Sequence, residues 1–254
     1  MNLRVENLTF AYRPGAPVLR ELNLEITPAK VTGLFGPNGS GKSTLLRCLT
    51  GALRPQSGTV WCGEQRVDTL TPREVARRIA VVPQDTPRGV PLTAREMVAL
   101  GRFALGDENP AVIAASLAQV DAAELADRPF DELSGGERQR VVIARALAQE
   151  TPALFLDEPS CHLDIAHQLA VWRLVRTLST GGHTVLMVCH DLVLAPMFVD
   201  RAILIAQGRL VAAGRPVETL GEENVSAVFG CRLRIEHRQP HSVSVTMDSV
   251  RQSP

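Results

Sequence analysis

Two segments of the chain carry the residue types that bind phosphate groups at the start of a helix. The first is GPNGSGKST, residues 36–44, which follows an apolar stretch and leads into a helical pattern. The second is LSGGERQR, residues 133–140, in which a serine and two glycines precede an apolar-periodic helix. Free backbone amides and the positive end of the helix dipole make such helix starts suitable for anions. The sequence therefore predicts two phosphate-binding helix starts in one chain.

The more complete of the two segments predicts a nucleoside triphosphate site. It fits the pattern G-x-x-x-x-G-K-[ST], whose glycines let backbone amides fold around phosphate oxygens. We expect Lys42 to place its charge on the β- and γ-phosphates and Ser43 to offer a hydroxyl ligand to Mg²⁺. The structural alternative is a glycine-rich turn with a solvated lysine, which the full motif between a strand and a helix disfavours. The candidate nucleotide-binding residues of this loop are Gly36, Pro37, Asn38, Gly39, Ser40, Gly41, Lys42, Ser43 and Thr44.

Polar residues come directly after three other apolar segments. Gln84 follows IAVVP, Asp157 and Glu158 follow PALFL, and His190 follows TVLMVC. Such apolar stretches, separated by helical patterns, are typical of a parallel α/β sheet, where ligands gather beyond the carboxyl ends of the strands. We therefore expect these side chains to meet the glycine loop at one site.

Each of these polar groups has a candidate role and a structural alternative. Asp157 is a candidate Mg²⁺ ligand through the water shell of the metal, and Glu158 is the candidate general base for an attacking water. Without the glycine loop, the acidic pair would instead be interpreted as the cap of a helix that starts near Asp164. A histidine or a glutamine at a strand end is often structural, so His190 and Gln84 gain weight only as members of a set.

The segments around these sites predict the fold. We expect an α/β chain with a P-loop NTPase (RecA-like) core, an N-terminal antiparallel β-layer in which Leu22, Leu24 and Ile26 share one face, and an α-helical subdomain insertion. The expected parts of this single domain of 254 residues are the core with its β-layer (1–86 and 150–215), the helical subdomain with the second helix start (87–149), and a C-terminal extension of short helices and weakly ordered structure (216–254).

Composition narrows the class of function. The 27 Lys and Arg residues balance 27 Asp and Glu, so the broad positive field of many nucleic-acid binders is absent. The apolar runs are too short to span a membrane, and the first residues, MNLRVENLTF, show no signal-peptide pattern. The five cysteines lack the spacing of a metal site, which favours buried, reduced thiols in a cytosolic protein.

Taken as an ordered set, the motifs resemble those of an ATP-binding cassette (ABC) ATPase, and the resemblance runs from residue 3 to about residue 220. Tyr12, GPNGSGKST, Gln84, LSGGERQR, ALFLDEP, SCHLD and His190 resemble, in that order, the A-loop, Walker A, Q-loop, signature, Walker B, D-loop and H-loop of the family. One departure is Glu137, which stands where the usual signature, LSGGQ, has glutamine.

The resemblance implies how the second helix start is used. In this family two cassettes pair head to tail, and the signature of one copy closes over the ATP that the glycine loop of the other copy holds. The signature residues expected to contact that ATP are Ser134, Gly135, Gly136 and Glu137. Because these contacts need the γ-phosphate, hydrolysis would remove them and open the dimer.

The same resemblance implies roles for the remaining motif residues. Tyr12 would stack on the adenine, and Gln84 would sense Mg²⁺ while moving the helical subdomain. His190 would contact the γ-phosphate and steady the water. The segment of Asp164 would report across the dimer interface.

Four longer stretches resemble the ATPases of bacterial importers for metal chelates. They are LTAREMVALGR, LSGGERQRVVIARALAQ, HLDIAHQLAVWRLV and GRPVETLGEENVSAVFG. The resemblance implies an ATP-driven motor at the cytoplasmic face of the inner membrane, bound beside Gln84 to a membrane permease and served indirectly by a substrate-binding protein. The cargo expected first is a ferric siderophore, followed by haem or cobalamin. Two alternatives stay open: a soluble ABC ATPase acting on nucleic acid or the ribosome, and an exporter or cofactor-assembly ATPase.

Overall fold

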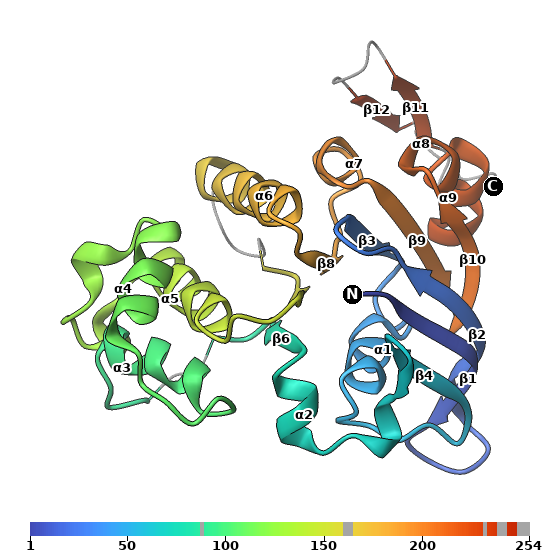
Figure 1. Ribbon diagram of the computed structural model, residues 1–254. Helices are drawn as coiled ribbons and strands as arrows, with labels where there is room; N and C mark the ends of the chain where they lie inside the picture. Colours follow the sequence, from blue (N-terminus) through green and yellow to red (C-terminus); the bar gives the residue numbers. More distant parts are fainter. Residues whose placement is uncertain (87–88, 160–164, 231–232, 238–242, 248–254) are drawn as a thin grey trace.

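Two sheets pack around one helix at the centre of the molecule. The computed structural model describes residues 1–86, 89–159 and 165–230, together with the backbone of residues 233–237 and 243–247. Helix α1 (Lys42–Leu49) follows the glycine loop and lies between the two sheets (Figure 1).

The smaller sheet is antiparallel and forms the N-terminal layer. Its strand order is β2-β1-β4-β5, with β1 (Leu3–Ala11), β2 (Pro17–Ile26), β4 (Ser57–Cys62) and β5 (Gln65–Arg66). Leu22, Leu24 and Ile26 of β2 are buried, whereas Asn23 and Glu25 between them are exposed. This alternation is the one that the sequence predicts, and it confirms the antiparallel β-layer.

The larger sheet carries the strand ends that the sequence singles out. Its order is β10-β9-β3-β8-β7-β6, with β3 (Val31–Phe35), β6 (Ile79–Val82), β7 (Ala153–Asp157), β8 (Thr184–Val188), β9 (Arg201–Ala206) and β10 (Arg209–Gly214). The pairs β3–β8, β8–β7, β7–β6 and β3–β9 are parallel, and β9–β10 is an antiparallel hairpin. The segments that follow β6, β7, β8 and β3 therefore leave the sheet at one edge.

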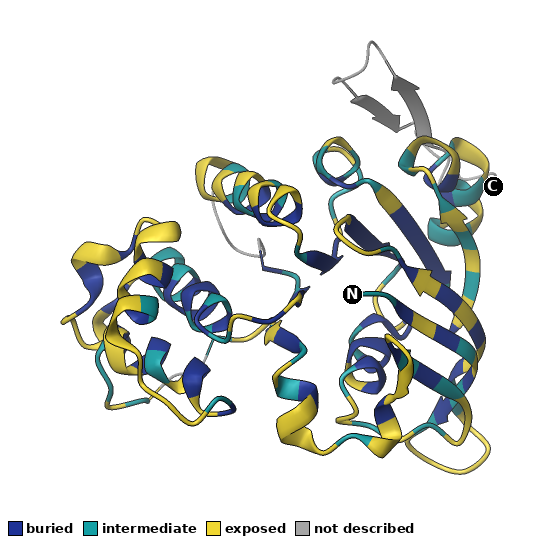
Figure 2. Cartoon of the chain, in the orientation of Figure 1, coloured by how far each residue is buried: buried dark blue, intermediate teal, exposed yellow. Residues whose placement is uncertain are grey.

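An apolar core lies on each face of the larger sheet. On one face, Leu45 and Leu49 of α1 pack with Phe155 and with the inner side of the smaller sheet. On the other face, helices contribute Val142 and Trp172 to a second core. Buried residues accordingly concentrate in the strands of the larger sheet and on the inward sides of the helices (Figure 2). This layered α/β architecture confirms the predicted P-loop fold.

Helices fill the described part of the chain between β6 and β7. They are α3 (Ala94–Ala99), α4 (Pro110–Gln119) and α5 (Gly135–Leu147), with the 3₁₀ turns Leu100–Arg102, Ala123–Leu125 and Phe130–Glu132. Thr93 begins α3 and Ser134 begins α5, and each forms a reciprocal capping box with the glutamate three residues later. The exact bounds of a helical subdomain, residues 87–149, stay a prediction.

The remaining elements are short helices, one longer helix and a pair of strands. Before β6 come the 3₁₀ turn Val67–Thr69 and α2 (Pro72–Ala76), and after β7 come α6 (Ile165–Thr180), α7 (Ala195–Phe198), α8 (Pro216–Thr219) and α9 (Glu222–Phe229). Beyond α9, strands β11 (Leu233–His237) and β12 (Val243–Met247) pair antiparallel. This pairing is not among the predicted features of residues 216–254, although apolar and polar residues alternate in LRIEH and VSVTM.

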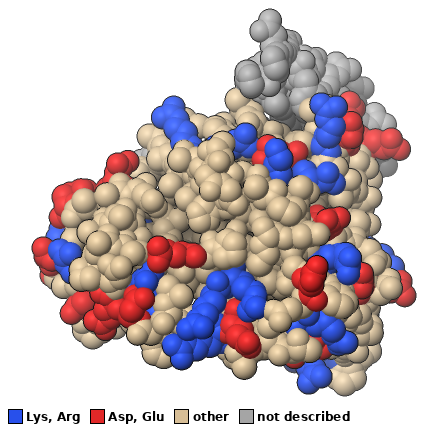
Figure 3. All heavy atoms as spheres, viewed as in Figure 1, with Lys and Arg blue, Asp and Glu red and all other residues tan. Residues whose placement is uncertain are grey.

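The surface seen in Figure 3 carries charges of both signs. Acidic side chains gather over the helical part at the left of the view, and a basic group lies near the lower centre. No single-sign field covers this face, in keeping with the zero net charge of the chain. Within the described residues, no helix has the length and apolarity that crossing a membrane requires.

Candidate functional site

The loop between β3 and α1 folds closely around the side chain of Lys42. Its ammonium donates to the carbonyl oxygens of Gly36 at 2.8 Å and Pro37 at 3.0 Å. Gly36 takes a φ of 150°, and a Cβ there would lie 2.1 Å from the carbonyl oxygen of Ile205. Gly41 takes a φ of 102° directly before the helix. The loop therefore depends on glycine for both its close approach and its left-handed backbone.

Lys42 is a buried cation that feels the charges of two acidic residues. Its exposed fraction is 5%. Burial lowers the pKa of Lys42, while the charges of Glu158 and Asp157 act against that shift. A buried cation and free backbone amides at the start of a helix together form a site for a polyphosphate.

Asp157 ends β7 beside this loop and has the properties of a metal ligand. Burial raises its pKa, whereas a hydrogen bond from Ser43 acts in the opposite direction. Among the described residues, its Oδ1 is buried without any hydrogen-bond partner. Those residues contain no cluster of three or more metal-binding side chains. One carboxylate with one hydroxyl fits Mg²⁺, which typically binds one or two protein oxygens together with phosphates and water.

Asp157→Asn is expected to stabilise the chain in the absence of nucleotide. The raised pKa means that ionisation of Asp157 destabilises the fold, and this effect grows as pH rises through that pKa. Removing the buried charge should raise the unfolding midpoint by roughly 2–4 °C, which corresponds to about 1 kcal/mol for a chain of this size. Thermal unfolding at neutral pH, with and without ATP and Mg²⁺, measures the gain.

If Asp157 holds Mg²⁺, the same Asp157→Asn variant should lose any further stabilisation that adding Mg²⁺ to the ATP-bound chain produces. Asp127→Asn is the matched control because Asp127 is exposed and far from the loop in sequence. An Asp157→Asn protein that is less stable without nucleotide, or that responds fully to Mg²⁺, would contradict the assignment of this carboxylate.

Three strand ends converge on Glu158. Gln84 follows β6 and donates through Nε2 to Glu158 Oε2 at 3.0 Å. His190 follows β8, and its Nε2 pairs with Glu158 Oε1. Glu158 itself has a φ of 51°, an unusual backbone conformation for a residue with a side chain. The structure thus brings together three of the four residues that the strand-end pattern predicts, and the fourth, Asp157, is the chain neighbour of Glu158.

Tyr12 lies at the side of the glycine loop. Its hydroxyl is 3.3 Å from Thr44 Oγ1, and its ring meets Phe10 edge-on with 4.9 Å between ring centroids. The side chain is nevertheless 56% exposed. An aromatic face held at the edge of a phosphate loop is available for stacking on a base.

The signature segment is a separate helix start. Ser134 caps α5: its Oγ accepts a hydrogen bond from the Glu137 amide at 3.3 Å, and the Glu137 carboxylate accepts one from the Ser134 amide at 2.7 Å. Within the described residues, no hydrogen bond or ion pair joins this helix start to the glycine loop of the same chain. Asp164, the D-loop candidate, lies outside the described residues.

The cysteines behave as the sequence suggests where they are described. Cys48, Cys62 and Cys189 are free and buried. Burial raises the pKa of the Cys48 thiol to about 12, so it stays protonated at neutral pH. Cys161 and Cys231 lie outside the described residues.

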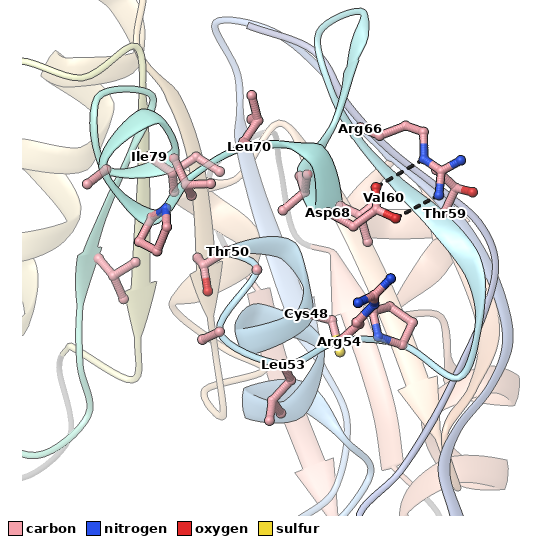
Figure 4. A pocket seen from close by; sticks show the side chains of 18 of the residues that line it. Cys48, Thr50, Leu53, Arg54, Thr59, Val60, Arg66, Asp68, Leu70 and Ile79 are labelled. Carbon is pink, nitrogen blue, oxygen red and sulfur yellow. Dashed lines mark hydrogen bonds and ion pairs between the residues drawn. The ribbon is translucent and has the colours of Figure 1, made fainter.

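A cavity of about 900 Å³ lies away from the glycine loop, between α1, the β4–α2 segment and α5. Leu53, Leu70 and Ile79 surround it together with Arg54, and Arg66 forms an ion pair with Asp68 at its rim (Figure 4). No residue of the range 36–44 lines it. No sequence pattern predicts this cavity, because its walls come from short segments that carry no motif.

The segment that carries the glycine loop, Gln84 and Glu158 matches a known family. Residues 19–161 match the family model described as ABC transporter. The chain belongs to the ABC transporter family. As an ABC ATPase it binds ATP and hydrolyses it.

A relative and two solved structures resemble this ABC ATPase over most of its length. The hemin import ATP-binding protein HmuV of Rhodococcus jostii is 40% identical over 243 residues, which are 93% of this chain and 83% of that protein. A solved transporter described as being of the metal-chelate type, in an inward-facing conformation, has a TM-score of 0.82 with 27% identity and covers 97% of this chain and 96% of that one. A dimeric ATP-binding cassette bound to ADP and phosphate has a TM-score of 0.76 with 29% identity and covers 84% of this chain and 98% of that one.

Proposed function

We propose that this ABC ATPase is the motor subunit of an importer that moves haem, or a closely related metal chelate, through a membrane permease. The observation that carries the proposal is the 40% identity with a hemin import ATP-binding protein over 93% of this chain. The likeness to a solved transporter of the metal-chelate type supports the same class of cargo. The cargo proposed first is therefore haem, in place of the ferric siderophore that the sequence favoured. Ferric siderophore and cobalamin remain the next candidates.

The proposed hydrolysis uses the residues at the edge of the larger sheet. Glu158 accepts a proton from the attacking water as the water oxygen bonds to the γ-phosphorus and the bond to the bridging oxygen breaks. Lys42 and the amides of the loop bind the β- and γ-phosphates, and His190 contacts the γ-phosphate. Mg²⁺, held by Ser43 and Asp157 and sensed by Gln84, would neutralise charge on the phosphates when bound.

Both carboxylate oxygens of Glu158, the proposed general base, already have a partner. One of its carboxylate oxygens is bonded to Gln84 and the other pairs with His190. Each carboxylate oxygen has two lone pairs, so Glu158 can accept a hydrogen bond from the attacking water in addition to these contacts. Gln84 is the residue proposed to move with Mg²⁺, since it follows an edge strand of the sheet.

We further propose that two copies of the chain form the complete ATP site. Among the described residues, no hydrogen bond or ion pair joins the helix start at Ser134, Gly135, Gly136 and Glu137 to the glycine loop of the same chain, so a phosphate bound there would come from a second copy. The likeness to a dimeric cassette supports this arrangement. In each site, Tyr12 would stack on the adenine.

Ser134→Ala tests this dimer. The variant should lower ATP turnover by roughly tenfold or more, because a hydrogen bond to a charged phosphate is removed. The affinity of the isolated monomer for ATP should stay nearly unchanged. Turnover and ATP titration of dilute monomer measure the two quantities separately, and a large loss of affinity in the monomer would mean that the serine acts within its own chain.

The partner proposed for the cavity beside α1 is a cytoplasmic segment of the permease. Its lining combines apolar side chains with Arg54, Arg66 and Arg145, against Asp68 alone among the acidic residues. A segment with an apolar face and carboxylates would complement this lining. The chain would then lie at the cytoplasmic face of the membrane through its partner, and a substrate-binding protein would deliver the cargo.

Stimulation of ATP turnover tests the proposed function. The full chain is co-purified with its permease, and its ATPase rate is measured with the binding protein loaded with haem, with ferric siderophore or with cobalamin. Haem should give the largest stimulation. Failure to associate with any permease would favour a soluble ABC ATPase acting on nucleic acid or the ribosome, and a permease complex that no loaded binding protein stimulates would favour an exporter or a cofactor-assembly ATPase.

A further inference from the structure

The signature helix of this chain begins with a carboxylate close to the place where a phosphate is proposed to bind. Glu137 is the third residue of α5, and one of its oxygens, Oε2, accepts a hydrogen bond from the Ser134 amide at 2.7 Å. This bond and the positive helix end favour the ionised form, and the pKa of Glu137 is lowered. A helix start that already holds a negative charge attracts a phosphate less strongly.

Arg128 is the charge that compensates this carboxylate. Its Nη1 lies 3.1 Å from Glu137 Oε1, which is the oxygen that the Ser134 amide does not use. Its main chain is fixed independently, because the carbonyl oxygen of Arg128 accepts from the Ala94 amide at 3.0 Å. The pair bridges the turn before α5 and the first turn of that helix.

The other arginines near this turn are engaged elsewhere. Arg138 donates to the carbonyl oxygen of Leu133 at 2.8 Å, and Arg140 donates to the carbonyl oxygen of Asp121. Arg140 acts on Glu137 only through its charge, which lowers the pKa of that carboxyl less than the charge of Arg128 does. Arg128 is therefore the cation in direct contact with the Glu137 carboxylate among the described residues.

We propose that Arg128 is a positioning residue for ATP: it holds and neutralises the Glu137 carboxylate, so that the Ser134 helix start can bind the γ-phosphate carried by a second copy of the chain. This proposal rests on the proposed function, since only a head-to-tail dimer brings that phosphate to Ser134. With Arg128 in place, the pair has no net charge. Without it, an unpaired carboxylate stands in the first turn of α5 and repels the phosphates.

Arg128→Gln removes the charge and keeps a polar side chain. The ATP concentration for half-maximal turnover should rise roughly three- to tenfold, and kcat should change little because the glycine loop and Glu158 are untouched. The effect should be larger at low ionic strength than at high, since the pair is partly exposed, with side chains 46% and 24% accessible. Steady-state ATPase measurements on the purified full chain at two salt concentrations provide these values.

Removing the carboxylate separates the electrostatic role from a structural one. In a Glu137→Gln background, Arg128→Gln should change the half-saturating ATP concentration by less than about twofold, because no charge remains to be neutralised. Arg128→Lys should recover most of the loss because it keeps the charge. A loss of the same size in both backgrounds would show that Arg128 only supports the turn, and it would overturn the proposal.

Arg95→Gln is the matched control. Arg95 pairs with Asp127 at 3.0 Å and is also 46% accessible, but its partner is not in the signature. It should leave the ATP dependence unchanged, and the unfolding midpoints of all variants show whether each is folded. An Arg128→Gln protein with wild-type ATP dependence overturns this inference alone. A wild-type chain without ATP turnover or ATP-dependent dimer instead overturns the proposed function, and this is seen before any variant is made.

Discussion

The Glu158→Gln variant should bind ATP with the same affinity as the wild-type chain. It should hydrolyse ATP at least about 100-fold more slowly. The substitution keeps the shape of the side chain and removes the group that would accept the proton of the water, a role worth roughly 10²- to 10⁴-fold in rate. Because ATP then persists between the glycine loop of one copy and the signature of the other, the variant should accumulate as a dimer. Phosphate release and size-exclusion chromatography with ATP measure the two effects.

Glu64→Gln is the control for this substitution. Glu64 is exposed in the turn between β4 and β5, at the far end of the smaller sheet from the strand ends. It should turn over ATP at the wild-type rate and stay in the wild-type oligomeric state. Turnover near wild type in Glu158→Gln would show that another group activates the water.

Lys42→Met should weaken ATP binding by roughly 10- to 100-fold. The ammonium is expected to exchange its bonds to Gly36 and Pro37 for charge-assisted bonds to phosphate oxygens, and such bonds contribute about 1.5–3 kcal/mol. The fold should be retained, because the substitution removes a buried cation whose pKa burial already lowers. Calorimetric titration with ATP gives the affinity, and thermal unfolding gives the stability.

Lys30→Met supplies a close control, since Lys30 and Lys42 are the lysines of the chain. Lys30 is exposed just before β3, at the opposite end of that strand from the glycine loop. ATP affinity should be unchanged in this variant. Unchanged affinity in Lys42→Met would contradict the assignment of the phosphate site.

The sequence predicts the parts of the site that local pattern and topology determine. The glycine loop is recognisable because a tight turn around phosphates requires particular residue types at fixed positions. The meeting of Gln84, Glu158 and His190 follows from parallel strands that end at one edge of a sheet. Neither prediction needs side-chain geometry.

Other features depend on contacts that no local pattern encodes. Gln84 and His190 each contact a different oxygen of the Glu158 carboxylate, and Glu158 has a φ of 51°; both depend on the folded chain. The pairing of Arg128 with Glu137 joins a turn to a helix start across nine residues, and Arg128 belongs to no motif. The cavity beside α1 has walls as far apart in sequence as Cys48 and Gln149, so only the folded chain defines it.

Transport in closed vesicles shows whether this ABC ATPase drives the uptake of haem. The chain and its permease are reconstituted in liposomes with ATP on the side of the ATPase, haem-loaded binding protein is added on the opposite side, and accumulated haem is measured over time. Haem uptake should require ATP, and it should be lost in vesicles that contain the Glu158→Gln variant. Haem uptake of equal rate with wild-type and Glu158→Gln chains, or ATP turnover without any movement of haem, would contradict the proposed function.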